Sequence, residues 1–423
     1  MKTRILKVPP GPDTGFFTAS TTGHALDSWA ISTAPPAQPG LAPLREAAAL
    51  LRTSDIPVAF PTETVYGLGA DATRSGAVKG IYAAKGRPSD NPLIVHVCDL
   101  TMLRGLLRGA EQTQESDEAE LIPEIYRELV KRFWPGPLTI LLRCPTPSPL
   151  ASEVTATLPT FGARMPASPL ARSLIALTGR PLAAPSANAS TKPSPTAASH
   201  VLDDLDGRIE LILDGGPCDV GVESTVVDGL CEDGGPPVVL RPGGVSLEEL
   251  RSIRGWEGCV KGYRDESEEG KVSGPRAPGM KYKHYSPKAR VVLFEKGEGN
   301  VLEELKTMEG RKAVVGIVRT LRWERLSGQN LAKEDAGLED EFATNGEATL
   351  GYEISTSVIE GSRVLDIGLG RETKSVAQGL FSALRELDRK GADIIFVEGV
   401  EDRDDIAAAV MNRLRKAASE IRA

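Results

Sequence analysis

Two cations in a short loop, Lys85 and Arg87, are the residues of this chain whose types and spacing most suggest chemistry. Glycine and proline neighbours stiffen the loop, and Asn91 follows in it. A helix is predicted just before them, over residues 78–84, so the simpler interpretation is a helix end whose dipole the cations neutralise. A stiff loop that carries Lys, Arg and Asn is better suited to binding a polyanion.

Three further segments place small hydroxyl or amide side chains where predicted strands end. Hydroxyls and backbone amides at strand-to-helix turns bind phosphate oxygens, and a guanidinium binds phosphate or carboxylate through two hydrogen bonds. Each segment alone could equally consist of helix caps and turn formers. Together they favour one shared anion-binding cleft, formed by Thr62-Glu63-Thr64, Ser186-Ala187-Asn188 with Ser194, Glu223-Ser224-Thr225, and the strand-end arginines Arg164 and Arg241.

Well-known catalytic patterns are absent or weak in the sequence. There is no Ser/His/Asp order, no H-E-x-x-H and no P-loop, and the strand histidine His96 is by itself more typical of a structural side chain. A G-x-G-x-x-A pattern at Gly67 and Gly69 stands too far from the preceding strand for good dinucleotide binding. Gly368 and Gly370 follow a better strand but lack the third small residue, which leaves a nicotinamide enzyme as a weak alternative.

An α/β framework is needed to bring these residues together. Helical and extended apolar patterns alternate along the first half of the chain. They predict helices over 44–55, 78–84, 100–107 and 122–133, from Pro169 to Thr178 and from Pro195, and strands over 58–60, 138–142, between Thr160 and Arg164, from 181, over 209–213 and from 238.

Composition divides the chain into four parts. Residues 1–41, rich in Pro, Gly, Ser and Thr, are predicted to be an extension with little core of its own. The predicted α/β domain covers 42–259, with an acidic stretch at 111–120 that loops out. Residues 260–288 are charged and Pro-rich, as is typical of a linker. Residues 289–423 alternate strands and helices and predict a smaller parallel-sheet domain.

Length and charge narrow the class of protein. The chain has 423 residues, too many for one compact core, and a net charge of −8, which argues against a protein that mainly coats nucleic acid. The five scattered cysteines predict free thiols in a reducing compartment. No apolar run predicts a membrane span or a secretory leader. A cytoplasmic location is expected, and the scarcity of acids before residue 40 leaves a mitochondrial fraction open.

Eight ordered motifs carry a family resemblance that extends from about residue 42 to the C-terminus. In the segments PTETVYGLG, KGRPSDNPLIVHV, WPGPLT, RMPASP, APSAN, PSPT, GVESTVV and LRPG, the chain resembles the YrdC-type threonylcarbamoyl-AMP synthase family. The motif PGMKYKHYSP and the C-terminal half resemble its two-domain form. The resemblance implies a YrdC-like, twisted mixed sheet with a concave basic cleft, followed by a small Rossmann-like parallel-sheet domain.

The resemblance also implies substrates and residue roles. L-threonine, bicarbonate and ATP would give threonylcarbamoyl-adenylate and pyrophosphate, with Lys85 and Arg87 as catalytic residues and magnesium entering with ATP. No metal ligand is expected on the protein. Threonine would be held by Thr62, His96, Arg164, Ser224 and the backbone of Ala184. ATP would be held by Lys85, Arg87, Asn91, Thr160, Ser186, Ser194 and Arg241, with Tyr282 reaching back from the linker as part of a lid.

The product implied by the resemblance serves the threonylcarbamoyladenosine modification beside the anticodon of tRNA, where a separate complex makes the transfer. The chemistry needs positioning and charge neutralisation more than a protein nucleophile. A different class stays open: a double-stranded RNA or tRNA-binding module could use the same basic cleft without catalysis. That alternative predicts tRNA affinity with a steep salt dependence and no need for threonine.

Overall fold

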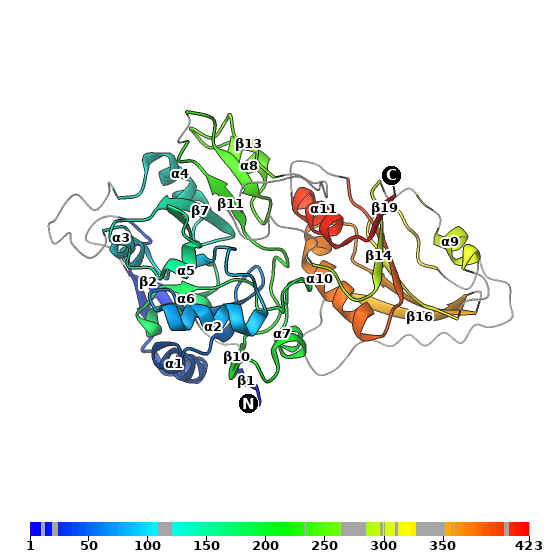
Figure 1. The fold of residues 1–423 in the computed structure, drawn as a ribbon, viewed down its shortest axis with the longest axis horizontal. Helices are drawn as coiled ribbons and strands as arrows, with labels where there is room; N and C mark the ends of the chain where they lie inside the picture. The colour runs from blue at the N-terminus through cyan, green and yellow to red at the C-terminus, as the bar shows by residue number, and fades with distance from the viewer. Residues whose placement is uncertain are drawn as a thin grey trace.

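A computed structural model describes residues 1–9, 13–18, 24–108, 121–231, 234–263, 285–296, 299, 301–308, 312–326, 352–359, 361–401 and 406–422. The chain forms two α/β lobes, each built on its own sheet (Figure 1). The predicted acidic loop at 111–120, most of the predicted linker and Tyr282 lie outside the described residues. Among the residues described, no helix is long and apolar enough to cross a bilayer.

The first lobe is organised on an eleven-stranded sheet in the order β1-β10-β4-β5-β9-β6-β8-β7-β11-β12-β13. It contains both parallel and antiparallel pairs, so the expected mixed sheet is confirmed. The strands are β1 (Arg4–Lys7), β4 (Val58–Pro61), β5 (Tyr66–Asp71), β6 (Ile94–His96), β7 (Leu138–Arg143), β8 (Thr160–Arg164), β9 (Leu182–Ala183), β10 (Leu211–Asp214), β11 (Thr225–Asp228), β12 (Val238–Arg241) and β13 (Val260–Lys261).

Two helices of the first lobe, those that start at Pro169 and Leu247, have a serine side chain as N-cap. Ser168 caps the helix that starts at Pro169, because its hydroxyl accepts a bond from the Ala171 amide at 3.3 Å. Gly86, at φ +61°, ends the helix before the cationic loop. The helices are α1 (Gln38–Thr53), α2 (Ser75–Lys85), α3 (Leu100–Arg108), α4 (Glu124–Phe133), α5 (Ser152–Thr155), α6 (Pro169–Thr178), α7 (Ala198–Leu205), α8 (Leu247–Arg251) and the 3-10 turn η1 (Pro35–Ala37).

The N-terminal residues are part of the domain, and the prediction of an extension with little core is wrong. Strand β1 pairs in parallel with β10, and Trp29 and Leu41 are buried in the same core as α6. A hairpin of β2 (Gly15–Phe17) and β3 (Trp29–Ile31) covers α6, and α1 already begins at Gln38. The physical reason is that β10 would otherwise present an open edge, which β1 covers.

The glycines of the G-x-G-x-x-A pattern lie within strand β5, not in a phosphate-binding turn. Gly69 faces Phe60 so closely that a Cβ at this position would lie 2.6 Å from the Phe60 ring. Strand β5 pairs antiparallel with β4 and directly follows it in the chain, whereas a dinucleotide fold needs a helix there. Gly69 therefore makes room for an aromatic ring.

The second lobe is a doubly wound sheet in the order β16-β17-β15-β18-β14-β19, parallel except for β16, as expected for a small parallel-sheet domain. Helices α10 and α11 lie on the side that faces the first lobe, and α9 lies on the far side (Figure 1). The elements are β14 (Arg290–Phe294), α9 (Val301–Thr307), β15 (Val314–Arg319), β16 (Glu353–Ile359), β17 (Ser362–Gly368), α10 (Thr373–Arg389), β18 (Ile394–Glu398), α11 (Ile406–Ala417) and β19 (Glu420–Arg422).

The two lobes are joined by buried contacts made by α10 and α11. Val222 of the first lobe belongs to the hydrophobic core of the second, and Tyr285 stacks on Phe381 of α10 with ring centres 5.3 Å apart. The hydroxyls of Thr196 and Ser382 are 2.7 Å apart across the boundary. The lobes thus share a core and a polar network, which places α11 beside the strand ends of the first sheet.

Candidate active site

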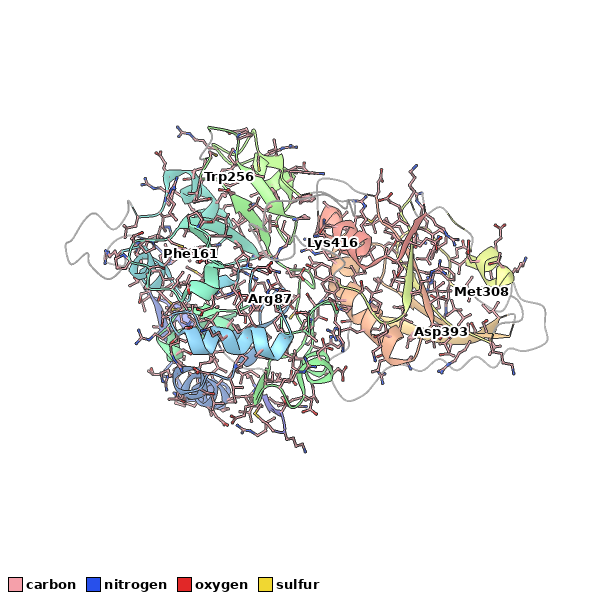
Figure 2. All side chains as sticks on the ribbon, in the orientation of Figure 1. Arg87, Phe161, Trp256, Met308, Asp393 and Lys416 are labelled. Atoms are coloured by element: carbon pink, nitrogen blue, oxygen red, sulfur yellow. The ribbon has the colours of Figure 1, made fainter. Side chains whose placement is uncertain are left out.

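A pocket opens where β4, β6, β8 and β12 end and where β11 begins, and it gathers residues from distant parts of the chain. Glu223 and Tyr285 contribute to its wall beside most of the predicted site residues. Figure 2 labels Arg87 beyond α2 in the first lobe and Lys416 on α11 of the second. The predicted residues that line the pocket are Thr62, Arg87, His96, Arg164, Ala184, Ser186, Ser224 and Arg241.

Arg164 is held rigidly at the end of β8. Its Nη2 donates to Glu63 Oε1 at 2.6 Å, and its Nε donates to the Gly136 carbonyl at 3.2 Å. The other oxygen of Glu63 accepts a bond from the Ala167 amide at 3.0 Å. Because the guanidinium is 4% exposed and fixed from two sides, it presents an oriented positive charge to the pocket.

His96 lies beside Arg164, since the two residues are partners in the parallel pair β6 and β8. Burial, and next the Arg164 charge, lower the pKa of His96 to about 3. Its Nδ1 lies 3.3 Å from the Ile94 carbonyl. The imidazole is therefore neutral near pH 7 and offers the pocket a hydrogen-bonding group without a charge.

The hydroxyls of Thr62 and Ser224 are bonded to neighbours, and their partners are hydroxyls, backbone groups and a guanidinium. Thr62 Oγ1 donates to the Val65 carbonyl at 2.7 Å and accepts bonds from the amides that follow it. Ser224 Oγ lies 2.8 Å from Thr139 Oγ1. These hydroxyls are arranged to bind polar groups, and nothing around them activates a nucleophile.

Arg87 and Arg241 form the cationic side of the pocket. Burial lowers the pKa of each guanidinium to about 10, so both stay protonated at neutral pH. Arg241 Nη2 donates to the Ser224 carbonyl at 2.8 Å. Arg87 Nε and Asn91 Oδ1 are buried and have no hydrogen-bond partner in the structure. Buried unsatisfied polar atoms are costly, and both atoms suit a bound polar ligand.

Lys85 does not line the pocket. Its ammonium is 2% exposed and donates to the Ser186 carbonyl, to the Asn188 carbonyl at 2.7 Å and to Asn188 Oδ1 at 3.5 Å. Burial, and next the charge of Arg87, hold the pKa of Lys85 well below its usual range. In this structure Lys85 fixes the turn after β9, whose Ser186 faces the pocket.

The other predicted ATP residues lie at different distances from the pocket. Ser194 is buried directly behind its wall, where its hydroxyl donates to Glu223 Oε1 at 2.5 Å. Asn91 lies in the cationic loop, and its carbonyl accepts a bond from Tyr82. Thr160 begins β8 opposite Arg143, at the far end of the strand from Arg164, so the structure does not bring it to the pocket.

The sequence did not identify two pocket residues. These are Tyr285 and, as a separate charge, Glu223. Glu223 appeared only as part of a hydroxyl-rich segment, and Tyr285 stands three residues after the predicted Tyr282 in the same motif. Tyr285 is 2% exposed, and burial raises its pKa to about 12. A tyrosine in a linker and an acid beside Ser-Thr carry no spacing signal that predicts these positions.

Among the described residues, no three His, Cys, Asp or Glu side chains lie close enough together to hold a metal ion. The carboxylate of Glu223 in the pocket wall is paired with Arg413 at 2.9 Å, and that of Glu63, which holds Arg164, is paired with it at 2.6 Å. The pocket thus offers hydroxyls and amides more readily than spare carboxylates, which fits an ion held by phosphate oxygens.

Comparisons with known proteins cover both lobes. A model described as Telomere recombination matches residues 51–243, and one for the threonylcarbamoyl-AMP synthase C-terminal domain matches residues 245–419. The chain is 45% identical over 395 residues to the threonylcarbamoyl-AMP synthase of Schizosaccharomyces pombe, covering 89% of this chain and 88% of that one. It is 42% identical over 375 residues to the threonylcarbamoyl-AMP synthase of Bacillus subtilis, covering 89% of this chain and 92% of that one.

A solved structure agrees with these relatives. The crystal structure of P. abyssi Sua5 complexed with L-threonine matches with a TM-score of 0.67 and 39% sequence identity, covering 90% of this chain and 95% of that one. Similarity of this extent spans both sheets and the segment between them. The predicted resemblance is confirmed: the chain belongs to the two-domain, Sua5-type threonylcarbamoyl-AMP synthase family of enzymes.

Proposed function

We propose that this enzyme converts L-threonine, bicarbonate and ATP into threonylcarbamoyl-adenylate and pyrophosphate. The observation that carries the proposal is the pocket that brings Arg164, His96 and Ser224 together with Arg87 and Arg241 in one wall. One set fits an amino acid and the other fits phosphates. The P. abyssi relative was crystallised with L-threonine, which supports the assignment of the substrate.

Threonine would bind on the Arg164 side. The Arg164 guanidinium is fixed by Glu63 and the Gly136 carbonyl, so it can bind the substrate carboxylate without reorganising. A neutral His96 and the hydroxyls of Thr62 and Ser224 would bind its polar groups. The backbone of Ala184, whose amide is bonded to the Ile94 carbonyl at 3.0 Å, would complete this side through its remaining polar group.

ATP would bind on the cationic side, with Arg87, Arg241 and Ser186 at the phosphates. The threonine amine and carbon dioxide would form a carbamate, whose oxygen attacks the α-phosphorus while pyrophosphate leaves. Positive charge at the leaving group and an oriented carbamate would account for catalysis. The pairing of the Thr62 and Ser224 hydroxyls with a carbonyl and a threonine hydroxyl supports a mechanism in which neither forms a covalent enzyme intermediate.

The remaining assignments are also proposals. Magnesium would enter with ATP, held by phosphate oxygens and water. Contact of ATP with Lys85, Asn91, Thr160 and Ser194 stays a prediction, and Lys85 has its donors engaged by the Ser186 turn. The product would serve threonylcarbamoyladenosine formation on tRNA through a separate transfer complex, in the cytoplasm. Direct contact with tRNA stays part of the RNA-binding alternative.

Pyrophosphate release by purified full-length protein tests the proposal. Release from ATP with magnesium should require both threonine and bicarbonate, and neither omission should leave more than a trace. Serine in place of threonine controls for the side chain. Release that ignores threonine would contradict the assignment. No release from a folded sample that binds tRNA with a steep salt dependence would favour the RNA-binding alternative.

A further inference from the structure

Helix α11 of the second lobe sends one arginine into the wall of the pocket. Arg413 is fully buried, and both its Nε and its Nη2 donate to Glu223 Oε2, at 3.0 and 2.9 Å. Its Nη1 donates to the Pro242 carbonyl at 2.6 Å, just after strand β12. Arg413 therefore contacts a pocket carboxylate and the backbone beside the pocket residue Arg241.

Glu223 is a negative charge on the side of the pocket assigned to phosphates. Its other oxygen accepts the Ser194 hydroxyl, and the charges of Arg413 and next Arg241 help to hold its pKa at about 2. It is thus a carboxylate at every physiological pH. A carboxylate here would repel a triphosphate unless a cation compensates it.

Two arginines therefore stand beside one carboxylate. Arg413 binds Glu223 through two charge-assisted hydrogen bonds. Arg241 instead donates to the Ser224 carbonyl, from Nε at 3.1 Å and from Nη2 at 2.8 Å. The pair Arg413 and Glu223 is neutral, so the charge of Arg241 is not needed to balance the carboxylate. Without Arg413, Glu223 would draw on Arg241 or remain as a buried unpaired charge.

We propose that Arg413 is a positioning residue for ATP: by neutralising and fixing Glu223, it removes an uncompensated negative charge from the side of the pocket where Arg87 and Arg241 would bind the nucleotide phosphates. The second lobe thus completes the nucleotide side of a pocket whose substrate-binding residues come from the first. This inference rests on the proposed function. It gives the second domain a role in substrate binding that goes beyond docking.

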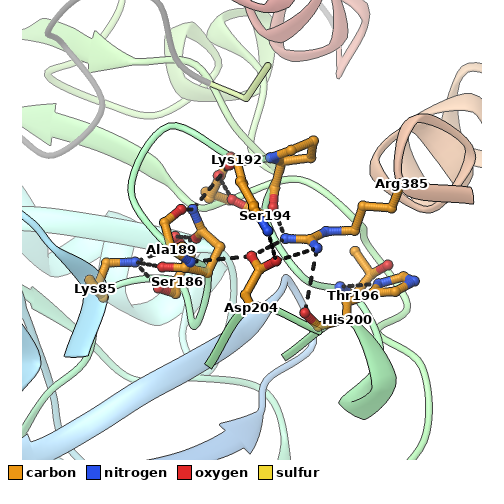
Figure 3. A network of polar contacts seen from close by, with 12 residues as sticks. Lys85, Ser186, Ala189, Lys192, Ser194, Thr196, His200, Asp204 and Arg385 are labelled. Carbon is orange, nitrogen blue, oxygen red and sulfur yellow. Dashed lines mark hydrogen bonds and ion pairs between the residues drawn. The ribbon is translucent and has the colours of Figure 1, made fainter. Parts of the chain in front are cut away.

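A second arginine offers a matched control for lobe docking. Arg385 on α10 also crosses the boundary, with Nη2 and Nη1 donating to the two oxygens of Asp204 at 2.7 and 3.2 Å (Figure 3). Asp204 is bonded to Lys192 and to the Ala189 amide, and it does not line the pocket. Replacing Arg385 therefore breaks a comparable buried ion pair without adding charge to the pocket.

The test compares full-length Arg413→Gln, Arg385→Gln and the double variant Glu223→Gln/Arg413→Gln. We expect Arg413→Gln to raise the KM for ATP at least tenfold and to change the KM for threonine less than threefold. Arg385→Gln should lower the melting temperature but keep the KM for ATP within twofold. The double variant should recover most of the ATP affinity, because the uncompensated carboxylate has been removed together with its partner.

Two results would overturn the inference. One is an unchanged KM for ATP in Arg413→Gln with a loss of stability like that of Arg385→Gln, which would make Arg413 a docking residue only. The other is a double variant that binds ATP no better than Arg413→Gln. Calorimetric titration of each variant with ATP and magnesium gives the same comparison without turnover. If wild type binds ATP but releases no pyrophosphate, the proposed function fails and the positioning role is still measured.

Discussion

At the scale of single residues, substitutions of Arg164 and Arg87 test whether the pocket has one side for threonine and another for ATP. Replacing Arg164 with Ala removes the fixed guanidinium and leaves Glu63 unpaired, so the KM for threonine should rise about 30-fold, equivalent to about 2 kcal/mol for a lost charge-assisted contact. Arg87→Ala should chiefly raise the KM for ATP. Steady-state pyrophosphate release, with each substrate varied in turn, measures both effects.

Arg180→Ala is the control for this pair, because Arg180 is an exposed arginine between α6 and β9. Its kinetics should match wild type. Equal changes in both KM values for Arg164→Ala would show that the site is not divided as proposed. Unchanged kinetics in either pocket variant would remove that residue from the site.

Two buried histidines predict how stability depends on pH. Burial, and next a nearby arginine, lower the pKa of both His96 and His200 to about 3, well below the ordinary value of about 6.5. Below pH 6.5 the unfolded chain binds protons that the folded chain does not. The free energy of unfolding should therefore fall as pH drops from 7 to 5, by about 2 kcal/mol for each histidine.

Urea unfolding at pH 7.5, 6 and 5 measures this slope. The double variant His96→Asn/His200→Asn should lose most of the difference between pH 7.5 and pH 5, whatever its absolute stability. His24→Asn, at a half-buried histidine whose Nδ1 accepts a bond from the Leu26 amide, controls for the exchange itself. A double variant with the slope of wild type would mean that these histidines are protonated in the folded enzyme.

The chemistry of the pocket could be read from residue types, whereas the pairing of its charges could not. Arg164 and Arg241 end apolar strands, Ser224 immediately precedes one, and strand ends meet at one edge of a sheet. Lys85 donates a hydrogen bond to the carbonyl of Ser186, which lies 101 residues away in the chain. The pairing of Glu223 with Arg413 joins residues 190 apart, from different lobes. Local patterns carry no information about such contacts.

At the scale of elements, long amphipathic helices and apolar strands were predictable, and the element rich in glycine was not. Strand β5 reads as a corner because Gly67 and Gly69 interrupt its apolar pattern. The position of the Phe60 ring explains Gly69, where a Cβ would lie 2.6 Å from it. The helix predicted from Pro195 begins at Ala198, and the strand β1 lacks a strong pattern since it is a short edge strand.

The packing of β5 gives a test of this explanation. A methyl group at Gly69 would lie 2.6 Å from the buried Phe60 ring, so Gly69→Ala should destabilise the protein by about 1–3 kcal/mol through overpacking. At Gly67 the nearest atoms would lie 3.5 Å away, an ordinary contact, so Gly67→Ala should cost much less. Urea unfolding of the two variants measures the difference.

Phe60→Leu should partly restore Gly69→Ala, because the smaller side chain vacates the space that the methyl group needs. The double variant is the control for a backbone effect. If Gly69→Ala were as stable as Gly67→Ala, or if Phe60→Leu gave no relief, the glycine would be required for another reason than the ring.

At the scale of the whole molecule, two domains were predictable but their docking was not. Composition shifts and the βα alternation indicate two sheets. The buried contacts of α10 and α11 with the first lobe depend on tertiary geometry. Gly221 shows how close this contact is: at φ +80°, a Cβ would lie 2.4 Å from the Ala377 carbonyl oxygen and from Gln378 Cα. A shared boundary of this kind predicts that the lobes unfold together.

Gly221→Ala should therefore weaken the docking of the lobes. This loss adds to the strain that any non-glycine residue meets in a left-handed backbone conformation, which costs about 1–2 kcal/mol. Gly216→Ala is matched for that strain, because Gly216 has φ +89° and open space where the Cβ would be. Scanning calorimetry should show one transition for wild type and Gly216→Ala, and a split or broadened one for Gly221→Ala. Since α11 also brings Arg413 to the pocket, Gly221→Ala should raise the KM for ATP as well. Identical behaviour of the two variants would mean that the lobes dock without this contact.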